Sequence, residues 1–280
     1  MGERRIAMVG LGSMNGAILA GLLSGGVAAE NVVATSRSAV SAQQRADQYG
    51  IRVLAQEEDD DANKSAVAEA DVVFLGAKPH QIVGLCQQIR DALKPEAVVV
   101  SVAAAVTLEM MEAALRPGQP VVRSMPNTPL SVGAGVVGLA AGAHVSQQQT
   151  EMVAELLGTS GAVHVLEEEQ IDALTGVAGS GPAYVFYLAE HMAAAGVEMG
   201  LSPELAGDLA AQTIAGAGKM LVANRATADA AELRANVSSP NGTTQRAIEA
   251  FDAHRMDQAI AAGVAASASR AAEITEQLRD

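Results

Sequence analysis

The densest group of potentially reactive side chains lies near the C-terminal end of the chain, in the segment VSSPNGTT at residues 237–244. Four hydroxyls and an asparagine stand there beside a turn-forming proline and glycine. A helix start offers open backbone N–H groups, which bind anions such as carboxylates. Thr is also a common N-cap residue, so the motif alone is equally compatible with an ordinary capped helix. The segment predicts one of these two roles for Ser239, Gly242, Thr243 and Thr244.

A pair of glycines near the N-terminus predicts a second site, for a nucleotide. Gly10 and Gly12 lie between the strand-like run IAMVG and a helix-like stretch. The first glycine permits a tight turn, the second lets a pyrophosphate approach the backbone, and the helix start favours negative charge. Asn15 occupies the third position of this fingerprint, where Gly or Ala normally keeps the helix close to the sheet. We therefore expect Asn15 to point away from the sheet or to push the helix outward.

The end of the next strand-like run indicates which dinucleotide is bound. NAD enzymes usually carry Asp or Glu there to hold the ribose hydroxyls. This chain has Ser36, Arg37 and Ser38 instead. A cation between hydroxyls suits the additional phosphate of NADP and leaves no carboxylate to repel it. NADPH is the predicted cofactor, with NADH as a possible second.

The other titratable residues indicate little acid–base or metal chemistry. The five histidines show neither metal-ligand nor triad spacing, so no metal is expected. Cys86 is the only cysteine, which excludes an intrachain disulfide and predicts a small buried residue in a helix.

The first half of the sequence alternates between short β-branched runs and helical stretches, which predicts a doubly wound parallel sheet. After about residue 166 the strand pattern stops and Ala-rich helical stretches follow. We place the domain boundary there, giving an α/β domain at 1–165 and an all-α domain at 166–280. The predicted strands are 6–10, 31–35, 71–77, 97–103, 120–125 and 162–166, and the predicted helices are 16–24, 39–49, 80–93, 107–115, 168–196, 203–224, 228–236 and 243–279.

The overall composition limits the classes of partner. The net charge of −14 argues against nucleic acid, because little in the chain would neutralise a row of phosphates. Glycines interrupt the apolar run at 6–23, which suits a strand–turn–helix better than a signal peptide or a membrane anchor. We expect a cytoplasmic protein that does not contact a membrane.

Four motifs in order, beyond the nucleotide loop, resemble pyrroline-5-carboxylate reductase. They are GAKPH (76–80), MPNTP (125–129), GVAGSGPAYVF (176–186) and ELRANVSSPNGTT (232–244). The resemblance runs essentially end to end. The chain departs from the family at Asn15 and at Asn241, where the family usually has Gly, but Asn tolerates a left-handed backbone well enough for the turn to form.

The resemblance implies a Rossmann-type NADP-binding domain and a helical dimerisation domain. It also implies which residues contact the substrate and the cofactor. It implies a homodimer with intertwined helical domains, or a larger assembly of such dimers. Glu168 and Thr244 would act at the reacting substrate, and Ser239, Gly242 and Thr243 would complete its site. The cofactor residues would be Val9, Gly10, Leu11, Gly12, Ser13, Met14, Ser36, Arg37, Ser38, Asn63, Gly76, Ala77, Lys78, Pro79, Val102, Ala103, Ala104 and, from a neighbouring subunit, Asn236.

The activity implied is reduction of 1-pyrroline-5-carboxylate to proline by direct hydride transfer. A protonated cyclic imine accepts hydride with little acid–base help, which agrees with a C-terminal half rich in hydroxyls and poor in catalytic His or Lys. Two alternatives remain at this point, a 3-hydroxyacid dehydrogenase and a non-catalytic NADP-binding protein. The first needs a helical Lys with Asn four residues on, whereas Lys219 and Asn224 are five residues apart, on different sides of a regular helix.

Overall fold

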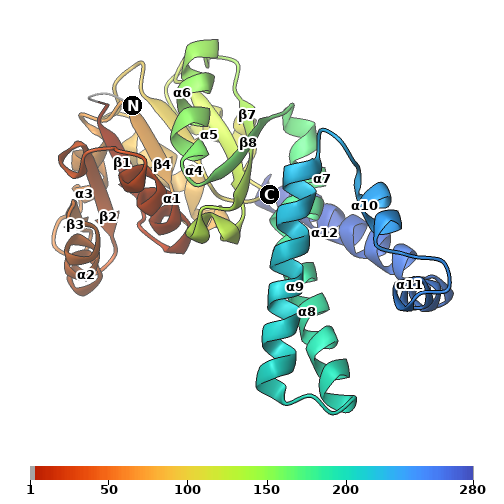
Figure 1. The fold of residues 1–280 in the computed structure, drawn as a ribbon. Helices are drawn as coiled ribbons and strands as arrows, with labels where there is room; N and C mark the ends of the chain where they lie inside the picture. The colour runs from red at the N-terminus through yellow and green to blue at the C-terminus, as the bar shows by residue number, and fades with distance from the viewer. Residues whose placement is uncertain (1–3, 280) are drawn as a thin grey trace. The chain divides into compact units, whose positions relative to one another are not determined.

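The computed structural model describes residues 4–279, and its N-terminal part is built on an eight-stranded sheet (Figure 1). Neighbouring strands are parallel except for the antiparallel pair β6 and β7. The order across the sheet is β3-β2-β1-β4-β5-β6-β7-β8. The strands are β1 (Ile6–Val9), β2 (Val32–Ser36), β3 (Arg52–Ala55), β4 (Val72–Leu75), β5 (Val98–Ser101), β6 (Val121–Pro126), β7 (Gly135–Ala141) and β8 (Gly161–Val165).

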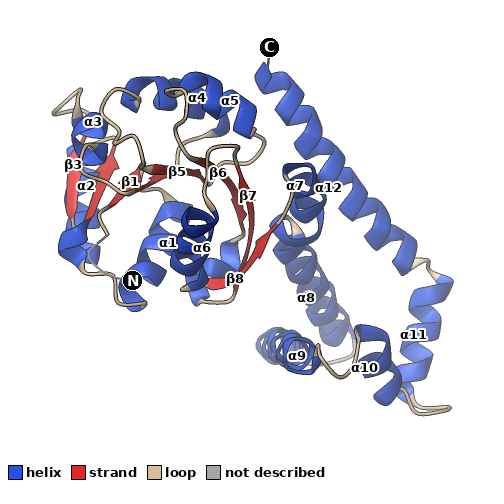
Figure 2. Ribbon diagram, turned by 90° about the horizontal axis from the view of Figure 1, so that it is seen from above, coloured by secondary structure: helices blue, strands red, loops and turns tan. Residues whose placement is uncertain are grey.

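Helices cover both faces of the sheet, which is therefore doubly wound as predicted (Figure 2). Alternate residues of β1 face opposite sides, so Ile6 and Met8 belong to one apolar cluster and Ala7 and Val9 to the other. Burial on both faces explains why the central strands read as continuous apolar runs. Helices α1 (Ser13–Ser24) and α6 (Gln147–Gly158) cover one face, α4 (Pro79–Ile89) and α5 (Leu108–Ala114) cover the other, and α2 (Ala39–Tyr49), α3 (Ala62–Val67) and the 3₁₀ turns η1 (Ala29–Asn31) and η2 (Thr128–Val132) complete this part.

The six predicted strands are all present, but two strands were missed. The edge strand β3 begins with exposed Arg52 and is only partly buried, so its apolar pattern is weak. The strand β7, GVVGLAA, is rich in Gly and Ala, which are poor strand formers. Helix α6 was also absent from the prediction.

The C-terminal part is entirely helical, but two of its predicted helices are interrupted. Residues 168–179 form three short pieces before α8, including a π-helical turn. The predicted helix 243–279 was wrong as a single element, because Arg255 has a left-handed backbone (φ 56°) that ends α11. The elements are η3 (Glu168–Gln170), α7 (Ile171–Leu174), the π-helix η4 (Thr175–Gly179), α8 (Gly181–Glu198), α9 (Pro203–Asn224), α10 (Ala230–Asn236), α11 (Thr243–Ala253) and α12 (Met256–Arg279).

The chain forms two compact units whose boundary differs from the sequence-based division near residue 165. One unit runs to Gly179 and includes the chain from Ser267 onward, and the other comprises Ser180–Ala266. The last strand does end at Val165. Residues beyond it stay with the sheet because Ile171 and Leu278 pack into the same apolar cluster as β4 and α5. Assigning separate functions to 1–165 and 166–280 remains a proposal.

The helical unit buries little apolar surface by itself. In α8 and α9 only the small residues Gly196, Ala206 and Ala210 are buried. Large apolar side chains on the same helices are exposed, among them Phe186 (65%), Tyr187 (65%) and Val222 (73%). By contrast Cys86 is buried in α4, as predicted. No helix within residues 4–279 is long and apolar enough to cross a membrane.

Candidate functional site

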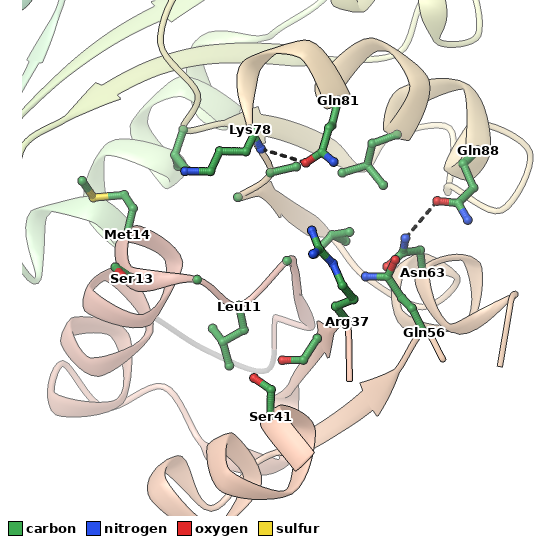
Figure 3. A pocket seen from close by; sticks show the side chains of 18 residues that line it. Leu11, Ser13, Met14, Arg37, Ser41, Gln56, Asn63, Lys78, Gln81 and Gln88 are labelled. Atoms are coloured by element: carbon green, nitrogen blue, oxygen red, sulfur yellow. Dashed lines mark hydrogen bonds between the residues drawn. The ribbon is translucent and has the colours of Figure 1, made fainter. Parts of the chain in front are cut away.

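A cavity of about 760 Å³ opens at the carboxyl ends of β1, β2, β4 and β5 (Figure 3). Open α/β sheets bind ligands at this edge, where the strand order reverses. Of the predicted cofactor residues, those lining the cavity are Val9, Gly10, Leu11, Gly12, Ser13, Met14, Ser36, Arg37, Asn63, Gly76, Ala77, Lys78 and Val102.

The loop between β1 and α1 has the geometry of a phosphate cradle. Gly10 adopts a positive φ of 79°, which a side chain would disfavour. The loop is fixed to β2 because Gly10 N–H donates to Thr35 Oγ1 (3.0 Å) and Leu11 N–H donates to the Thr35 carbonyl (2.8 Å). Gly12 is the N-cap of α1, no side chain caps this helix, and its first turn holds no acidic residue. Open N–H groups at a positive dipole end fit the pyrophosphate of a dinucleotide.

Asn15 points toward the sheet, so the expectation that its side chain points away was wrong. It is 1% exposed, and its Nδ2 lies 3.2 Å from the Gly10 carbonyl and 3.4 Å from the Phe74 carbonyl. Gly76, at the end of the facing strand, supplies the space. Asn15 thus links the cofactor loop to β4, and whether it also moves the helix outward remains a prediction.

The end of β2 presents one cation and one buried hydroxyl to the cavity. Arg37 is exposed and forms no ion pair with any described residue, so its guanidinium is available to a phosphate. Ser36 Oγ is buried and has no hydrogen-bond partner within residues 4–279. Ser38 Oγ accepts the Ser41 N–H (3.2 Å) as the N-cap of α2, and Ser38 does not line the cavity, so its predicted contact with the cofactor remains a prediction. Ser41 lines the cavity in its place.

The other predicted cofactor residues lie outside the cavity lining. Pro79 is the first residue of α4, and Ala103 and Ala104 follow β5 directly after Val102. Asn236 is the last residue of α10 and is exposed. Their predicted contacts with the cofactor remain predictions.

Five cavity residues were missed by the sequence reading. Ser41 and Gln56 follow β2 and β3, and Gln81, Leu85 and Gln88 project from α4. The last three are spaced i, i+4 and i+7, which places them on one face of a helix. That spacing, behind the motif GAKPH, was the signal that could have found them.

Glu168 lies among structural partners. One of its carboxylate oxygens accepts the Leu108 N–H at 2.8 Å and pairs with Arg123 at 3.0 Å, and Arg123 is 5% exposed. Arg123 also pairs with Asp172 at 3.5 Å. These residues line a smaller hollow that shares no residue with the dinucleotide cavity. Glu168 therefore helps to compensate a buried arginine, and its predicted contact with substrate remains a prediction.

The turn at 237–244 forms an open helix start. Gly242 is the N-cap of α11, and no side chain caps this helix. Thr243 and Thr244 are its first two residues, so neither acts as the N-cap that the alternative interpretation required. Asn241 adopts the expected left-handed backbone (φ 60°). The first backbone N–H groups of α11 are thus not capped by a side chain, and Ser239 Oγ lies close to Gly242 at the helix start.

Two family models match the chain. The model described as pyrroline-5-carboxylate reductase dimerisation matches residues 168–274, and the model described as NADP oxidoreductase, coenzyme F420-dependent, matches residues 5–105. They cover the helical part and the dinucleotide-binding part of the fold, respectively.

Curated relatives match over nearly their whole length. The chain is 41% identical to a pyrroline-5-carboxylate reductase of Pseudomonas aeruginosa over 279 residues, which covers 99% of both proteins. It is 38% identical to one from Mycobacterium tuberculosis, covering 99% of this chain and 98% of that protein.

Solved structures show the same architecture. A pyrroline-5-carboxylate reductase from Coxiella burnetii superposes with a TM-score of 0.90 at 32% identity, covering 98% of this chain and 99% of that one. The reductase of Plasmodium falciparum, solved with NADP bound, shares the fold with a TM-score of 0.85 at 23% identity, covering 98% and 99% of the two chains.

Proposed function

Because this chain belongs to the pyrroline-5-carboxylate reductase family, we infer that it reduces 1-pyrroline-5-carboxylate to proline with NADPH. The observation that carries this inference is the cavity at the switch point of the sheet, which combines a glycine cradle, an open helix start and an unpaired arginine. The same features support NADPH as the cofactor, because Arg37 stands where an NAD enzyme carries a carboxylate.

The residues of the cavity bind and orient the reactants. When bound, NADPH supplies the hydride that reduces the C=N carbon. The loop from Gly10 to Ser13 holds the pyrophosphate through backbone N–H groups. Gly76, Lys78 and Val102, at the ends of β4 and β5, line the way to the nicotinamide end. The protein thus contributes by positioning, which suffices for a substrate that is already an iminium ion when its nitrogen is protonated.

The substrate carboxylate binds, in this proposal, at the start of α11. Two features support this, the uncapped N-terminus of that helix and the half-buried Thr244 at its second position. The positive dipole end contributes about 0.3–2 kcal/mol, and the hydroxyls of Ser239 and Thr244 add hydrogen bonds. Glu168 is kept as a proposed substrate contact on the family resemblance alone.

Assembly as a homodimer through the helical unit is the other part of the proposal. Its support is the exposed apolar surface of α8 and α9, which exceeds what an isolated unit with so few buried residues would tolerate. The dimerisation model that matches residues 168–274 covers the same elements. A larger assembly of such dimers and a cytoplasmic location also remain predictions.

The 3-hydroxyacid dehydrogenase alternative loses its remaining support. It needs Lys and Asn on one helix face, but Lys219 and Asn224 are five residues apart in the continuous helix α9, where Asn224 Nδ2 donates to the Met220 carbonyl at 2.8 Å.

The test follows NADPH oxidation with pyrroline-5-carboxylate as substrate and proline as the identified product. A 3-hydroxyacid with NADP⁺ is the parallel assay. Proline formation supports the proposal. Turnover of the hydroxyacid alone, or cofactor binding without any turnover, would refute it.

A further inference from the structure

Helices α3 and α4 are joined at the wall of the dinucleotide cavity by a hydrogen bond between two amide side chains. Asn63 Nδ2 donates to Gln88 Oε1 at 2.9 Å (Figure 3). Both residues line the cavity. Asn63 is 2% exposed, whereas Gln88 is exposed at the surface of α4.

This hydrogen bond decides which end of the Asn63 amide is left for a ligand. An amide side chain has an N–H₂ donor and a carbonyl acceptor. The Gln88 carbonyl binds the donor end, so the acceptor Oδ1 remains. Asn63 Oδ1 is buried and has no hydrogen-bond partner among the described residues. A buried acceptor in this state is unfavourable until a donor reaches it.

The chemistry of the ligand then restricts what Asn63 can contact. An ionised phosphate oxygen only accepts hydrogen bonds, so it would be repelled by Oδ1. A ribose hydroxyl can donate. Arg37 projects into the same part of the cavity as Asn63 (Figure 3), so phosphate and hydroxyl recognition are adjacent there. We propose that Gln88 is a positioning residue, which orients the Asn63 amide so that Oδ1 accepts a hydrogen bond from a hydroxyl of the adenosine ribose.

The proposal rests on the proposed use of NADPH, but it differs from the role of Arg37. Arg37 would recognise the extra phosphate and act on NADPH alone. The ribose keeps a free hydroxyl in both NADPH and NADH. The Gln88–Asn63 pair should therefore affect both cofactors equally.

The experiment measures the dissociation constants of NADPH and NADH by the fluorescence of the bound reduced nicotinamide. It needs no reduction of the imine, so a failure of this inference is distinguishable from a failure of the proposed reaction. Gln88→Leu should raise both constants by about three- to tenfold, the value of one hydrogen bond. Gln88→Glu keeps an acceptor oxygen for Asn63 Nδ2 and should bind NADH more tightly than Gln88→Leu does, whereas its negative charge should weaken NADPH, which carries the additional phosphate. Gln87→Leu is the matched control, because Gln87 is the exposed neighbour outside the cavity lining.

A double-mutant cycle with Asn63→Ala tests whether Gln88 acts through Asn63. In that background Gln88→Leu should have no further effect. The proposal would be overturned if Gln88→Leu weakened cofactor binding equally with and without Asn63. It would also be overturned if Gln88→Leu weakened only NADPH binding, or neither cofactor. If Asn63→Ala does not fold, Asn63→Ser replaces it in the cycle. Gln88→Leu should have no further effect in that background either, and a further loss of cofactor binding there would overturn the proposal.

Discussion

The Asn15 side chain occupies the space that a side chain on Gly76 would need. A Cβ atom on Gly76 would lie 2.5 Å from Asn15 Cγ and 2.6 Å from the Gly10 carbonyl oxygen. In the usual dinucleotide fingerprint, a small residue on the helix leaves room for the helix to pack closely against the sheet. Here the small residue is on the facing strand end, and the larger one is on the helix.

Gly76→Ala should therefore destabilise the protein by about 1–3 kcal/mol, the usual cost of overpacking. Asn15→Ala removes the side chain that would clash, so the double variant should recover part of this loss. Urea unfolding of the two single variants and the double variant measures the coupling. Strictly additive losses would show that the two positions are independent.

Arg37→Ala should weaken NADPH binding about ten- to a hundredfold and leave NADH binding nearly unchanged. The reason is the loss of one charge-assisted contact, worth roughly 1.5–3 kcal/mol. The matched control is Arg45→Ala in α2, since Arg45 bonds Gln48 and does not line the cavity. Equal losses with both cofactors would mean that Arg37 does not recognise the phosphate.

Thr244→Ala should raise KM for pyrroline-5-carboxylate severalfold without lowering Tm or NADPH affinity, because the helix it begins is not capped by its side chain. Ser202→Ala provides the contrast. Ser202 Oγ does cap α9, accepting the Leu205 N–H at 3.3 Å. Its loss should cost about 1 kcal/mol of stability and leave KM unchanged. If Thr244→Ala instead lowers Tm and leaves KM unchanged, the turn serves only to start the helix.

Cys86 should make the protein less stable in alkaline solution. Burial raises the pKa of its thiol from 9.0 to about 12. The folded state therefore keeps the proton that the unfolded state loses, so stability is unaffected below pH 9.0 and falls as the pH rises from there toward 12. At about pH 10 the loss should be roughly 1.4 kcal/mol. Urea unfolding at about pH 8 and about pH 10 measures it, and Cys86→Ala should lack this part of the decline.

The homodimer proposal predicts a particle of at least twice the monomer mass and a Tm that rises with protein concentration. The apolar side chains exposed on α8 and α9 would be covered in the dimer and exposed by its dissociation. Light scattering combined with thermal unfolding over a range of concentrations tests this. A fully active monomer in dilute solution would contradict it.

Sequence patterns were sufficient where one local rule decides the structure. The strand at 6–9 and the turn after it follow from apolar periodicity and from glycine positions. Helix α9 was predicted with its bounds, Pro203 to Asn224, because Ser202 and Pro203 mark its start clearly.

What was missed depends on contacts between distant residues. The side chain of Asn15 could not be placed from the sequence, because nothing there shows that Gly76, directly after β4, faces it. The break at Arg255 carries no glycine or proline to reveal it. Gln88 is unremarkable in the sequence, and only the position of α3 beside α4 gives it a partner in Asn63.

The contribution of α12 to both compact units has a consequence for synthesis on the ribosome. Leu278 packs against the apolar cluster that holds residues of β4 and α5, and it is synthesised long after the last strand, β8. While the chain is still growing, that cluster lacks a component, although every strand of the sheet has already emerged. The N-terminal unit therefore reaches its final packing only once α12 has been synthesised, and a chain terminated before α12 would leave part of its core open to water.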